Sequence, residues 1–419
     1  MQLNHLSLTH FRNFTRLDFS PSDGITILVG ANAQGKTSLL DAIHYLTSAQ
    51  SPHTSNDRHL IHFDALQDSP PFARIVAEIQ RNRIENTSGE NEGSEHKTKP
   101  LRIEIRLILN NGGPNNNKRL RREILINGVK RKLRDLAGEF NAVMFLPKDM
   151  RVVEGSPSDR RYFLDNALCQ SNTQYAHALS DYSTVLSQRN ALLKQLQERT
   201  PGKDEITYWD EKLCEHAATL IAIRIHALHE INERARPIHQ DLTRGKEDLQ
   251  LEYLPSFMLS PQADTAGGET EVGADAESQI NAEEIQSTMM TTLQRKRAEE
   301  IARGTTTVGP HRDDFRFLAN DIDLRFYGSR GQNRTAMLAT QLAEVDWLRQ
   351  MTGEYPVLLL DEVMAELDPT RREDLLKRLS TAHQAILTTA DLNMFSEEFR
   401  HQADLYQIAD GLISPYREN

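Results

Sequence analysis

Cysteine is nearly absent from this sequence, and long apolar runs are missing. The 419 residues include 2 cysteines, Cys169 and Cys214, too few for a disulfide framework or a zinc site, and we interpret both as buried, reduced thiols. No apolar run approaches the roughly 18 residues of a membrane-spanning helix, and the chain does not open with a basic segment followed by an apolar stretch. We therefore expect a cytoplasmic protein with no membrane partner.

A surplus of basic residues is also lacking. The net charge of −11 argues against a uniformly basic nucleic-acid binder. Much of the acid is local, however, because seven acidic residues and no basic ones lie between Pro261 and Ile285. The rest of the chain can therefore carry a basic face. Its 38% apolar and 26% charged residues are typical of globular proteins, and its length favours two or three domains.

The hydrophobic pattern changes twice along the chain. Residues 1–157 contain alternating runs and a strand–turn–helix pattern around Gly30, whereas residues 158–304 have long helical periodicity. Strand and helix patterns return in residues 305–419, with the last strand expected near residues 385–389. We predict an α/β domain built from both ends of the chain and split by a mostly helical lobe.

Two polar stretches, at about residues 256–284 and 85–97, are predicted to be mobile loops. The first contains the acidic cluster and lies inside the helical lobe.

The turn between the predicted strand and helix fits the P-loop pattern G-x-x-x-x-G-K-[ST]. Glycines let successive N–H groups and the helix N-terminus surround a β-phosphate. Lys36 would reach the β- and γ-phosphates, and Thr37 would give a hydroxyl to Mg²⁺. We predict ATP and Mg²⁺ as cofactors, held by Gly30, Ala31, Asn32, Ala33, Gln34, Gly35, Lys36, Thr37 and Ser38.

A buried-strand pattern at residues 357–360 delivers two carboxylates, Asp361 and Glu362, at its C-terminal end. Open α/β sheets bind ligands at that edge. Asp361 would hold magnesium together with Thr37, and Glu362 would be the catalytic base beside Lys36. Alone, this pattern also fits a solvated strand end; the P-loop upstream favours the functional interpretation.

Two further segments bear on the class of P-loop protein. Ser329, Gly331 and Gln332 precede a predicted helix and match the S-x-G-Q form of the signature of ATP-binding-cassette ATPases, where the serine and the helix N-terminus meet nucleotide bound by the opposite protomer. Glu366, Leu367 and Asp368 follow Glu362 as the D-loop does in that class. Each segment alone also fits an ordinary helix start.

Long stretches of the sequence resemble the RecF family of recombination mediators, which is related to SMC-type ATPases. The resemblance is carried by L-T-H-F-R-N-F at residues 8–14, E-G-S-P-S-D-R-R-Y-F-L-D at 154–165, S-Q-R-N-A-L-L-K at 187–194, T-V-G-P-H-R-D-D at 307–314 and Y-P-V-L-L-L-D-E-V-M-A-E-L-D-P-T-R-R at 355–372. It covers nearly the whole chain except the two polar stretches.

The resemblance implies an ABC-type, SMC-like ATPase head with an inserted helical lobe. It implies a slow, DNA-dependent ATPase that forms an ATP-dependent homodimer and binds gapped DNA or junctions between single and double strands. With RecR- and RecO-like partners it would help to load a RecA-type recombinase during repair and the SOS response, near the nucleoid. Hydrolysis would release the dimer.

Three positions depart from the family pattern. Glu362 stands where many relatives have a second aspartate, and Lys148 stands where an acid is common. The strand after Glu362 ends without a histidine at the switch position, and either Thr389 or Asp391 can serve there.

The alternation of apolar and polar residues at 101–109, the turn that follows and the return through residues 124–126 predict a hairpin, and a basic run crosses it. It is predicted to contact DNA phosphates, although such a run also fits a solvated face. It comprises Lys118, Arg119, Arg121, Arg122, Lys130, Arg131, Lys132 and Arg134. Arg160, Arg161, His311 and Arg312 fit internal ion pairs as well as contacts with DNA.

Three alternatives share the P-loop: a transporter ATPase subunit, a small-molecule kinase, and a scaffold that uses ATP as a clamp. Transporter cassettes lack a large helical lobe, and a kinase has no use for a signature or D-loop. Glu362 argues against a pure scaffold.

Overall fold

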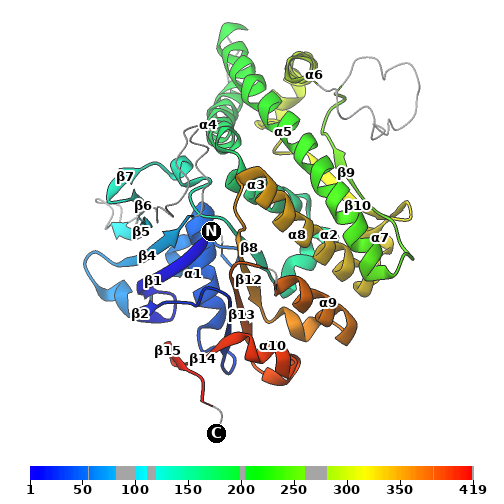
Figure 1. Cartoon of the computed structure of the whole chain (residues 1–419). Helices are drawn as coiled ribbons and strands as arrows, with labels where there is room; N and C mark the ends of the chain where they lie inside the picture. The colour runs from blue at the N-terminus through cyan, green and yellow to red at the C-terminus, as the bar shows by residue number, and fades with distance from the viewer. Residues whose placement is uncertain are drawn as a thin grey trace, which may run out of the picture. The chain divides into compact units, whose positions relative to one another are not determined.

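The computed structural model divides the chain into two compact units, which are described separately (Figure 1). Unit 1 comprises Met1–Asp149 and Glu344–Asn419, and unit 2 comprises Met150–Ala343. The structure describes residues 1–54, 56–81, 100–110, 119–198, 203–259, 281–380 and 382–417.

An antiparallel sheet forms one layer of unit 1. Apolar and polar residues alternate along its strands, so that one face is buried and the other is open. The predicted hairpin is confirmed by β5 and β6, which pair from Ile103–Ile126 to Asn110–Arg119. In sheet order, the strands are β2 (Phe14–Phe19), β1 (Gln2–Phe11), β4 (Phe72–Gln80), β5 (Leu101–Asn110), β6 (Arg119–Ile126) and β7 (Val129–Arg131).

The second sheet of unit 1 is mostly parallel, and its central strands are apolar on both faces. Only the pairing of β14 with β15 is antiparallel. In sheet order, the strands are β15 (Leu412–Pro415), β14 (Ala403–Ala409), β3 (Ile25–Val29), β13 (Ala385–Thr389), β12 (Val357–Asp361) and β8 (Ala142–Phe145).

One apolar cluster joins α1 (Lys36–Ser48) to both sheets. Leu39, Leu40 and Ile43 of α1 are fully buried in it. Burying a side chain of this size contributes about 1.5–3 kcal/mol, so the helix that begins at the P-loop is firmly held. The other helices that lie wholly in unit 1 and are described are α9 (Pro369–Leu379) and α10 (Glu397–His401).

Unit 2 combines long helices with a small sheet. At its centre, the buried Arg189 of α4 donates to Asp210 of α5 at 2.8 Å and to Glu300 of α6 at 2.7 Å, which ties three helices together. The α-helices are α2 (Met150–Glu154), α3 (Pro157–Ser171), α4 (Thr173–Leu196), α5 (Lys203–Thr243), α6 (Ala282–Arg303), α7 (Leu324–Tyr327) and the part of α8 (Arg330–Thr352) that ends at Ala343. The sheet order is β11 (Ile322–Asp323), β10 (Asp314–Ala319), β9 (Leu249–Leu254).

The compact units differ from the domain boundaries predicted at residues 157 and 305. Residues 150–157 and 305–343 cluster with the helical unit. The reason is the pairing of β10 with β9, which ties the segment after residue 305 to the helical lobe. Sequence periodicity indicated strands after residue 305 but did not identify β9 within the helical lobe, so it gave no information about this pairing.

Two smaller expectations also need correction. The strand at Ala385–Thr389 is not the last one, because β14 and β15 follow it. The predicted mobile stretches fall mainly on residues 82–99 and 260–280, which lie outside the described residues. Glu283 and Glu284, assigned to the loop, are instead in the first turn of α6, where negative side chains stabilise a helix.

Candidate nucleotide site

The P-loop joins β3 to α1, and two of its glycines are required by local geometry. At Gly30, a Cβ atom would lie 2.4 Å from the carbonyl oxygen of Ile408. Gly35 has a φ of 111° and lies against the side chain of Asn13, so any other residue would be strained and would clash. The loop can therefore approach neighbouring backbone closely and turn directly into α1.

Lys36 crosses the loop that precedes it. Its ammonium donates to the carbonyl oxygens of Gly30 at 2.6 Å and Ala31 at 3.0 Å, and it pairs with Oε1 of Glu362 at 2.9 Å. The Lys36 side chain is 4% exposed, whereas that of Glu362 is 37% exposed. The lysine is therefore fixed at the mouth of the loop, while the carboxylate remains accessible.

Asp361 lies between two hydroxyl groups. Thr37 donates to its Oδ2 and Thr388 donates to its Oδ1, both at 2.8 Å. Burial raises the pKa of Asp361, and the two hydrogen bonds act in the opposite direction. A hydroxyl and a carboxylate are the hard oxygen donors that magnesium prefers, so the predicted metal residues, Thr37 and Asp361, are adjacent and chemically suitable.

Thr388 is a site residue that sequence reasoning missed. It also accepts from the backbone N–H of Glu362 at 3.0 Å and therefore holds both acids. Its position follows from the parallel pairing of β12 with β13, in which Asp361 is the partner of Thr388. The two candidate switch residues, Thr389 and Asp391, hydrogen-bond to each other in the turn after β13.

The backbone of Glu362 is in the left-handed region, with a φ of 53°. A non-glycine residue in this region is uncommon and carries a strain of order 1–3 kcal/mol. This conformation immediately after β12 turns the chain into a short 3-10 helix, Val363–Glu366. The strain is located at one of the two acids that the sequence singled out.

The predicted signature forms the N-terminus of α8 in unit 2. Ser329 and Gln332 cap the helix reciprocally: the Ser329 N–H donates to the Gln332 side chain at 2.9 Å, and the Gln332 N–H donates to Ser329 Oγ at 3.2 Å. A Cβ atom on Gly331 would meet only Ser329 Oγ, at 3.9 Å, so the surface above the helix start is open. The motif is thus a well-formed helix cap, and its residues Ser329 and Arg330 are exposed.

The predicted D-loop residues lie between β12 and α9. Asp368 caps α9 by accepting from the N–H of Arg371, and it pairs with the guanidinium of that residue at 3.0 Å. Leu367 is buried, and its carbonyl oxygen accepts from Arg372 at 3.1 Å. Glu366 ends the 3-10 helix before it.

The basic hairpin residues do not share one face. Alternation in β6 places Arg121 on the open face of the sheet, whereas Arg122 points to the α1 side and contacts Asp57 at 3.1 Å. Arg121 and Lys130 both pair with Glu123. Arg119, Arg131 and Lys132 are exposed, Arg134 is half-buried, and Lys118 lies outside the described residues.

Lys148 and the four other uncertain basic residues make local contacts. Lys148 donates to the carbonyl oxygen of Pro52, in the loop after α1. In unit 2, Arg160 pairs with Asp314 at 2.6 Å, and Arg161 donates to the carbonyl oxygen of Asp313 at 2.8 Å. His311 Nδ1 lies 2.6 Å from Tyr182 Oη, and Arg312 donates to the carbonyl oxygen of Thr306 at 3.4 Å.

A pocket of about 620 Å³ lies beside the start of α1. Ser38 of the P-loop lines it together with Arg12, Asn13, Arg58 and His59. Arg12 is held there by an ion pair with the buried Asp41 of α1. Of these lining residues, only Ser38 was among the predicted nucleotide contacts; Arg12 and Asn13 belong to the stretch 8–14 that carried the family resemblance.

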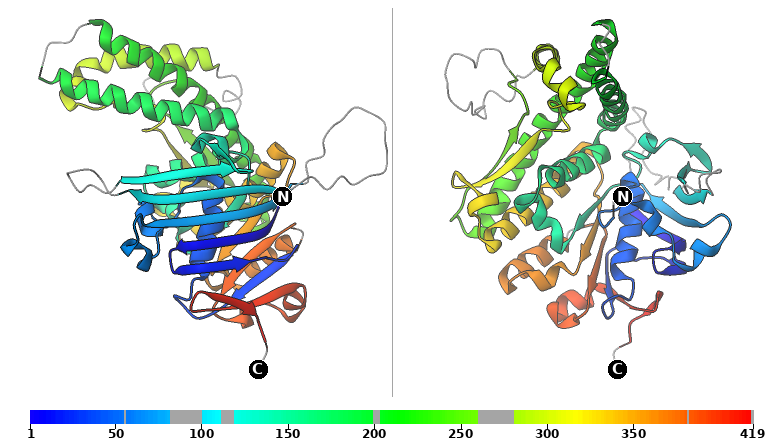
Figure 2. Two further views of the ribbon diagram at one scale, coloured as in Figure 1. Left: turned by 90° about the vertical axis from the view of Figure 1, so that its left-hand side faces the viewer. Right: turned by 180° about the vertical axis from the view of Figure 1, so that it is seen from behind.

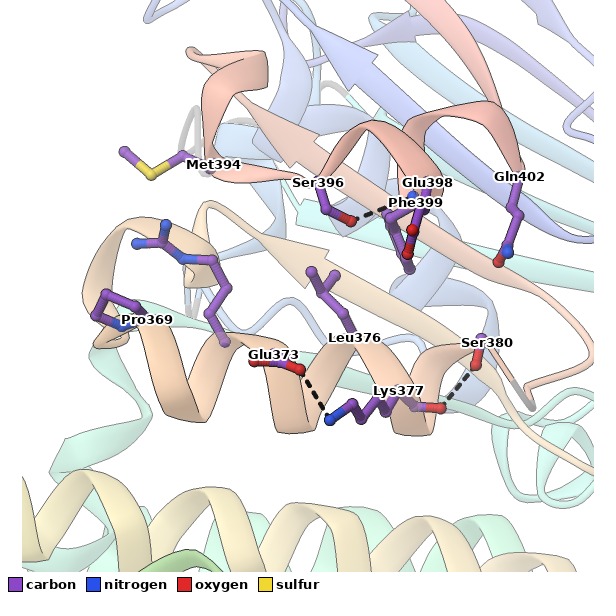
Figure 3. A pocket seen from close by; sticks show the side chains of 11 residues that line it. Pro369, Glu373, Leu376, Lys377, Ser380, Met394, Ser396, Glu398, Phe399 and Gln402 are labelled. Atoms are coloured by element: carbon purple, nitrogen blue, oxygen red, sulfur yellow. Dashed lines mark hydrogen bonds and ion pairs between the residues drawn. The ribbon is translucent and has the colours of Figure 1, made fainter.

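A second hollow, a groove of about 470 Å³, lies between α9 and the segment around α10 (Figure 3). Leu376 and Phe399 form its apolar floor, and Glu373 and Lys377 pair at its rim. None of the predicted nucleotide residues lines it.

Among the residues that the structure covers, no helix is long and apolar enough to cross a membrane.

Comparison with known proteins first identifies the class of P-loop protein to which the chain belongs. The family model described as RecF/RecN/SMC N terminal domain matches residues 2–413, which agrees with a P-loop head that has an inserted helical unit. Within this class, the chain is 37% identical to the DNA replication and repair protein RecF of Chloroflexus aurantiacus, over 99% of each chain. It is 36% identical to the protein of the same name from Lacticaseibacillus paracasei, over 99% of this chain and 100% of the relative. The chain belongs to the RecF family.

A solved structure supports the same fold assignment. The structure of the recombination mediator protein RecF-ATPrS in the RecFOR pathway superposes with a TM-score of 0.79 at 28% identity, covering 99% of this chain and 98% of the other. The predicted ABC-type, SMC-like head with an inserted helical lobe is therefore confirmed. Nothing in these relatives favours the transporter alternative.

Proposed function

We propose that this protein is an ATP-dependent DNA-binding ATPase of recombinational repair and replication-fork maintenance. The observation that carries the proposal is the meeting of Thr37, Asp361 and Thr388 at the end of β12, with Lys36 paired to Glu362 beside them. This arrangement supplies a cation for phosphates, oxygens for a metal and an accessible base. A RecF relative has been solved with ATP, which supports ATP as the nucleotide.

The nucleotide would be bound by the residues of the P-loop and α1. Backbone N–H groups of residues 30–38 and the N-terminus of α1 surround the phosphates, and Lys36 contacts the β- and γ-phosphate oxygens. The pocket lined by Ser38, Arg12 and Asn13 takes the part of ATP that extends beyond the phosphates. Thr37 and Asp361 would hold magnesium, which would neutralise charge on the phosphates.

Glu362 would act as the catalytic base once Lys36 has turned to the phosphates. The ion pair between the two side chains then opens, and the accessible carboxylate orients a water molecule. This water attacks the γ-phosphorus, its proton passes to Glu362, and the bond to the ADP oxygen breaks. The hydrogen bond from the Glu362 N–H to Thr388 holds the base during this step.

A second copy of the chain would complete the site. The N-terminus of α8 presents the exposed Ser329 and the positive end of the helix dipole, which suit the γ-phosphate bound by another protomer. The D-loop residues Glu366, Leu367 and Asp368 would lie at the same interface. ATP would therefore promote a homodimer, and hydrolysis would release it.

The biological role is proposed from the relatives. Curated relatives of this chain carry the name DNA replication and repair protein RecF, and two solved RecF structures are described as belonging to the RecFOR pathway. Gapped DNA or a single-strand/double-strand junction is the expected ligand. RecO- and RecR-like proteins and a RecA-type recombinase are the expected partners.

The deciding experiment is the molar mass in solution with magnesium and ATP, with and without gapped DNA. The wild type should form a dimer only with ATP, and DNA should strengthen it. Lys36→Met should remain monomeric, whereas Lys377→Met, which removes a lysine that is 68% exposed, should behave as wild type. A wild-type monomer under every condition contradicts the shared site.

A further inference from the structure

The open face of the antiparallel sheet in unit 1 carries an organised set of cations. Alternation along β4 to β7 directs six basic and three acidic side chains to this face, an excess of three positive charges. Figure 2 (left) shows these strands side by side, with α1 behind them. The basic residues are Arg74, Arg102, Arg106, Arg119, Arg121 and Lys130, and the acidic ones are Glu78, Glu104 and Glu123.

Two carboxylates hold most of these cations in place. Glu104 accepts from Arg74 at 2.7 Å and from Arg106 at 2.6 Å, and it lies 3.9 Å from Arg102. Hydrogen bonding by Arg74 is the largest influence on its carboxyl group, and the arginines together lower the pKa of Glu104 to about 2, so it remains ionised at neutral pH. The guanidinium groups are therefore arranged around a fixed negative charge rather than moving independently.

Glu123, on the neighbouring strand β6, also holds several cations in place. Arg121 and Lys130 pair with it, and Arg106 lies 4.0 Å away, between the two carboxylates. A carboxylate offers about four acceptor sites, whereas each guanidinium has five N–H donors. The face therefore presents more donors than its own acids can use, and most of the basic side chains are at least 40% exposed.

We propose that this face of β4–β7, the arginine face, binds the phosphodiester backbone of duplex DNA. A flat array of guanidinium groups matches phosphate oxygens bidentately and carries no base-reading geometry. Charge complementarity favours this ligand, because the protein as a whole is acidic and this surface has a cationic excess. The inference rests on the proposed DNA-binding function and shifts the contact from the hairpin as a whole to one face of the sheet.

A triple variant tests the arginine face and keeps both close partners of Glu104. Arg102→Ala/Arg121→Ala/Lys130→Ala removes three side chains that are 50%, 53% and 62% exposed. Glu104 keeps Arg74 and Arg106, and Glu123 keeps Arg106 at 4.0 Å. The matched control, Lys212→Ala/Arg303→Ala/Lys377→Ala, removes equally exposed cations that pair with acids on their own helices. ATP hydrolysis without DNA should be unchanged in both variants.

The readout is the salt dependence of binding to a short duplex with magnesium and ATP. Three lost phosphate contacts should reduce the slope of log K against log salt by about 2.7, so the loss of affinity between 50 and 200 mM salt becomes about 40-fold smaller than in the wild type. The control should keep the wild-type slope. A wild-type slope in the arginine-face variant overturns this proposal alone, whereas a wild type that does not bind duplex overturns the DNA-binding function as well.

Discussion

The Nζ of Lys36 and the Oε1 of Glu362 are 2.9 Å apart, which links the P-loop to the acid at the end of β12. A lysine that binds phosphates and a carboxylate that activates water cannot both remain in this pair during turnover. In the proposed mechanism, the ion pair is therefore one state of the site, and ATP would compete with Glu362 for the lysine.

Glu362→Gln separates binding from hydrolysis. The amide keeps the shape of the side chain but cannot accept a proton, so hydrolysis should fall by about 10²–10⁴-fold. ATP affinity should be equal or higher, because the carboxylate no longer competes for Lys36, and the ATP-bound dimer should accumulate. Single-turnover phosphate release and molar mass measure the two effects; unchanged turnover would contradict the role of Glu362 as the base.

Thr388→Val tests the hydroxyl that contacts both acids. The substitution preserves size and removes a donor to Asp361 and an acceptor for the Glu362 N–H. We expect a loss of about 1–3 kcal/mol in the free energy of unfolding and weaker Mg²⁺ dependence of ATP binding. Thr389→Val is the control, since its hydroxyl serves only the local turn at Asp391 among the described contacts. If both variants changed the Mg²⁺ dependence of ATP binding to the same extent, Thr388 would have no specific part in metal binding.

The sequence predicted local features well and pairing between distant segments poorly. The P-loop between β3 and α1, and the β5–β6 hairpin, follow from patterns within a few residues. Thr388 could not be found in this way, because its contact with Asp361 depends on the register of β13 against β12. The same limit explains the domain boundary, which depends on the pairing of β10 with β9.

Arg189 should be the least replaceable cation in unit 2. Its guanidinium pairs with Asp210 and Glu300, and all three side chains are fully buried. Arg189→Met removes the buried guanidinium from both carboxylates, of which Asp210 keeps its ion pair with Arg297 at 2.8 Å, and should cost about 3–5 kcal/mol of unfolding free energy. Lys212→Met, at an exposed pair, should change it by less than about 0.5 kcal/mol. Urea denaturation measures both, and a loss below about 1 kcal/mol for Arg189→Met would contradict the structural role.

Glu344, in the part of α8 that belongs to unit 1, should make stability depend on pH. Burial, assisted by the charge of Asp149, raises the pKa of Glu344 from 4.5 to about 8. The folded state therefore keeps a proton that the unfolded state loses, so this contribution is complete below about pH 4.5 and is lost as the pH rises towards 8. At pH 7 the loss amounts to roughly 3 kcal/mol.

Glu344→Gln should remove this contribution, because an amide does not titrate. Between pH 5 and 8, the variant should gain stability relative to the wild type as the pH rises, measured by urea denaturation across the range. Glu373→Gln, in an exposed pair with Lys377, is the control and should follow the wild-type profile. Parallel profiles for Glu344→Gln and the wild type would mean that Glu344 is ionised in the folded protein at neutral pH.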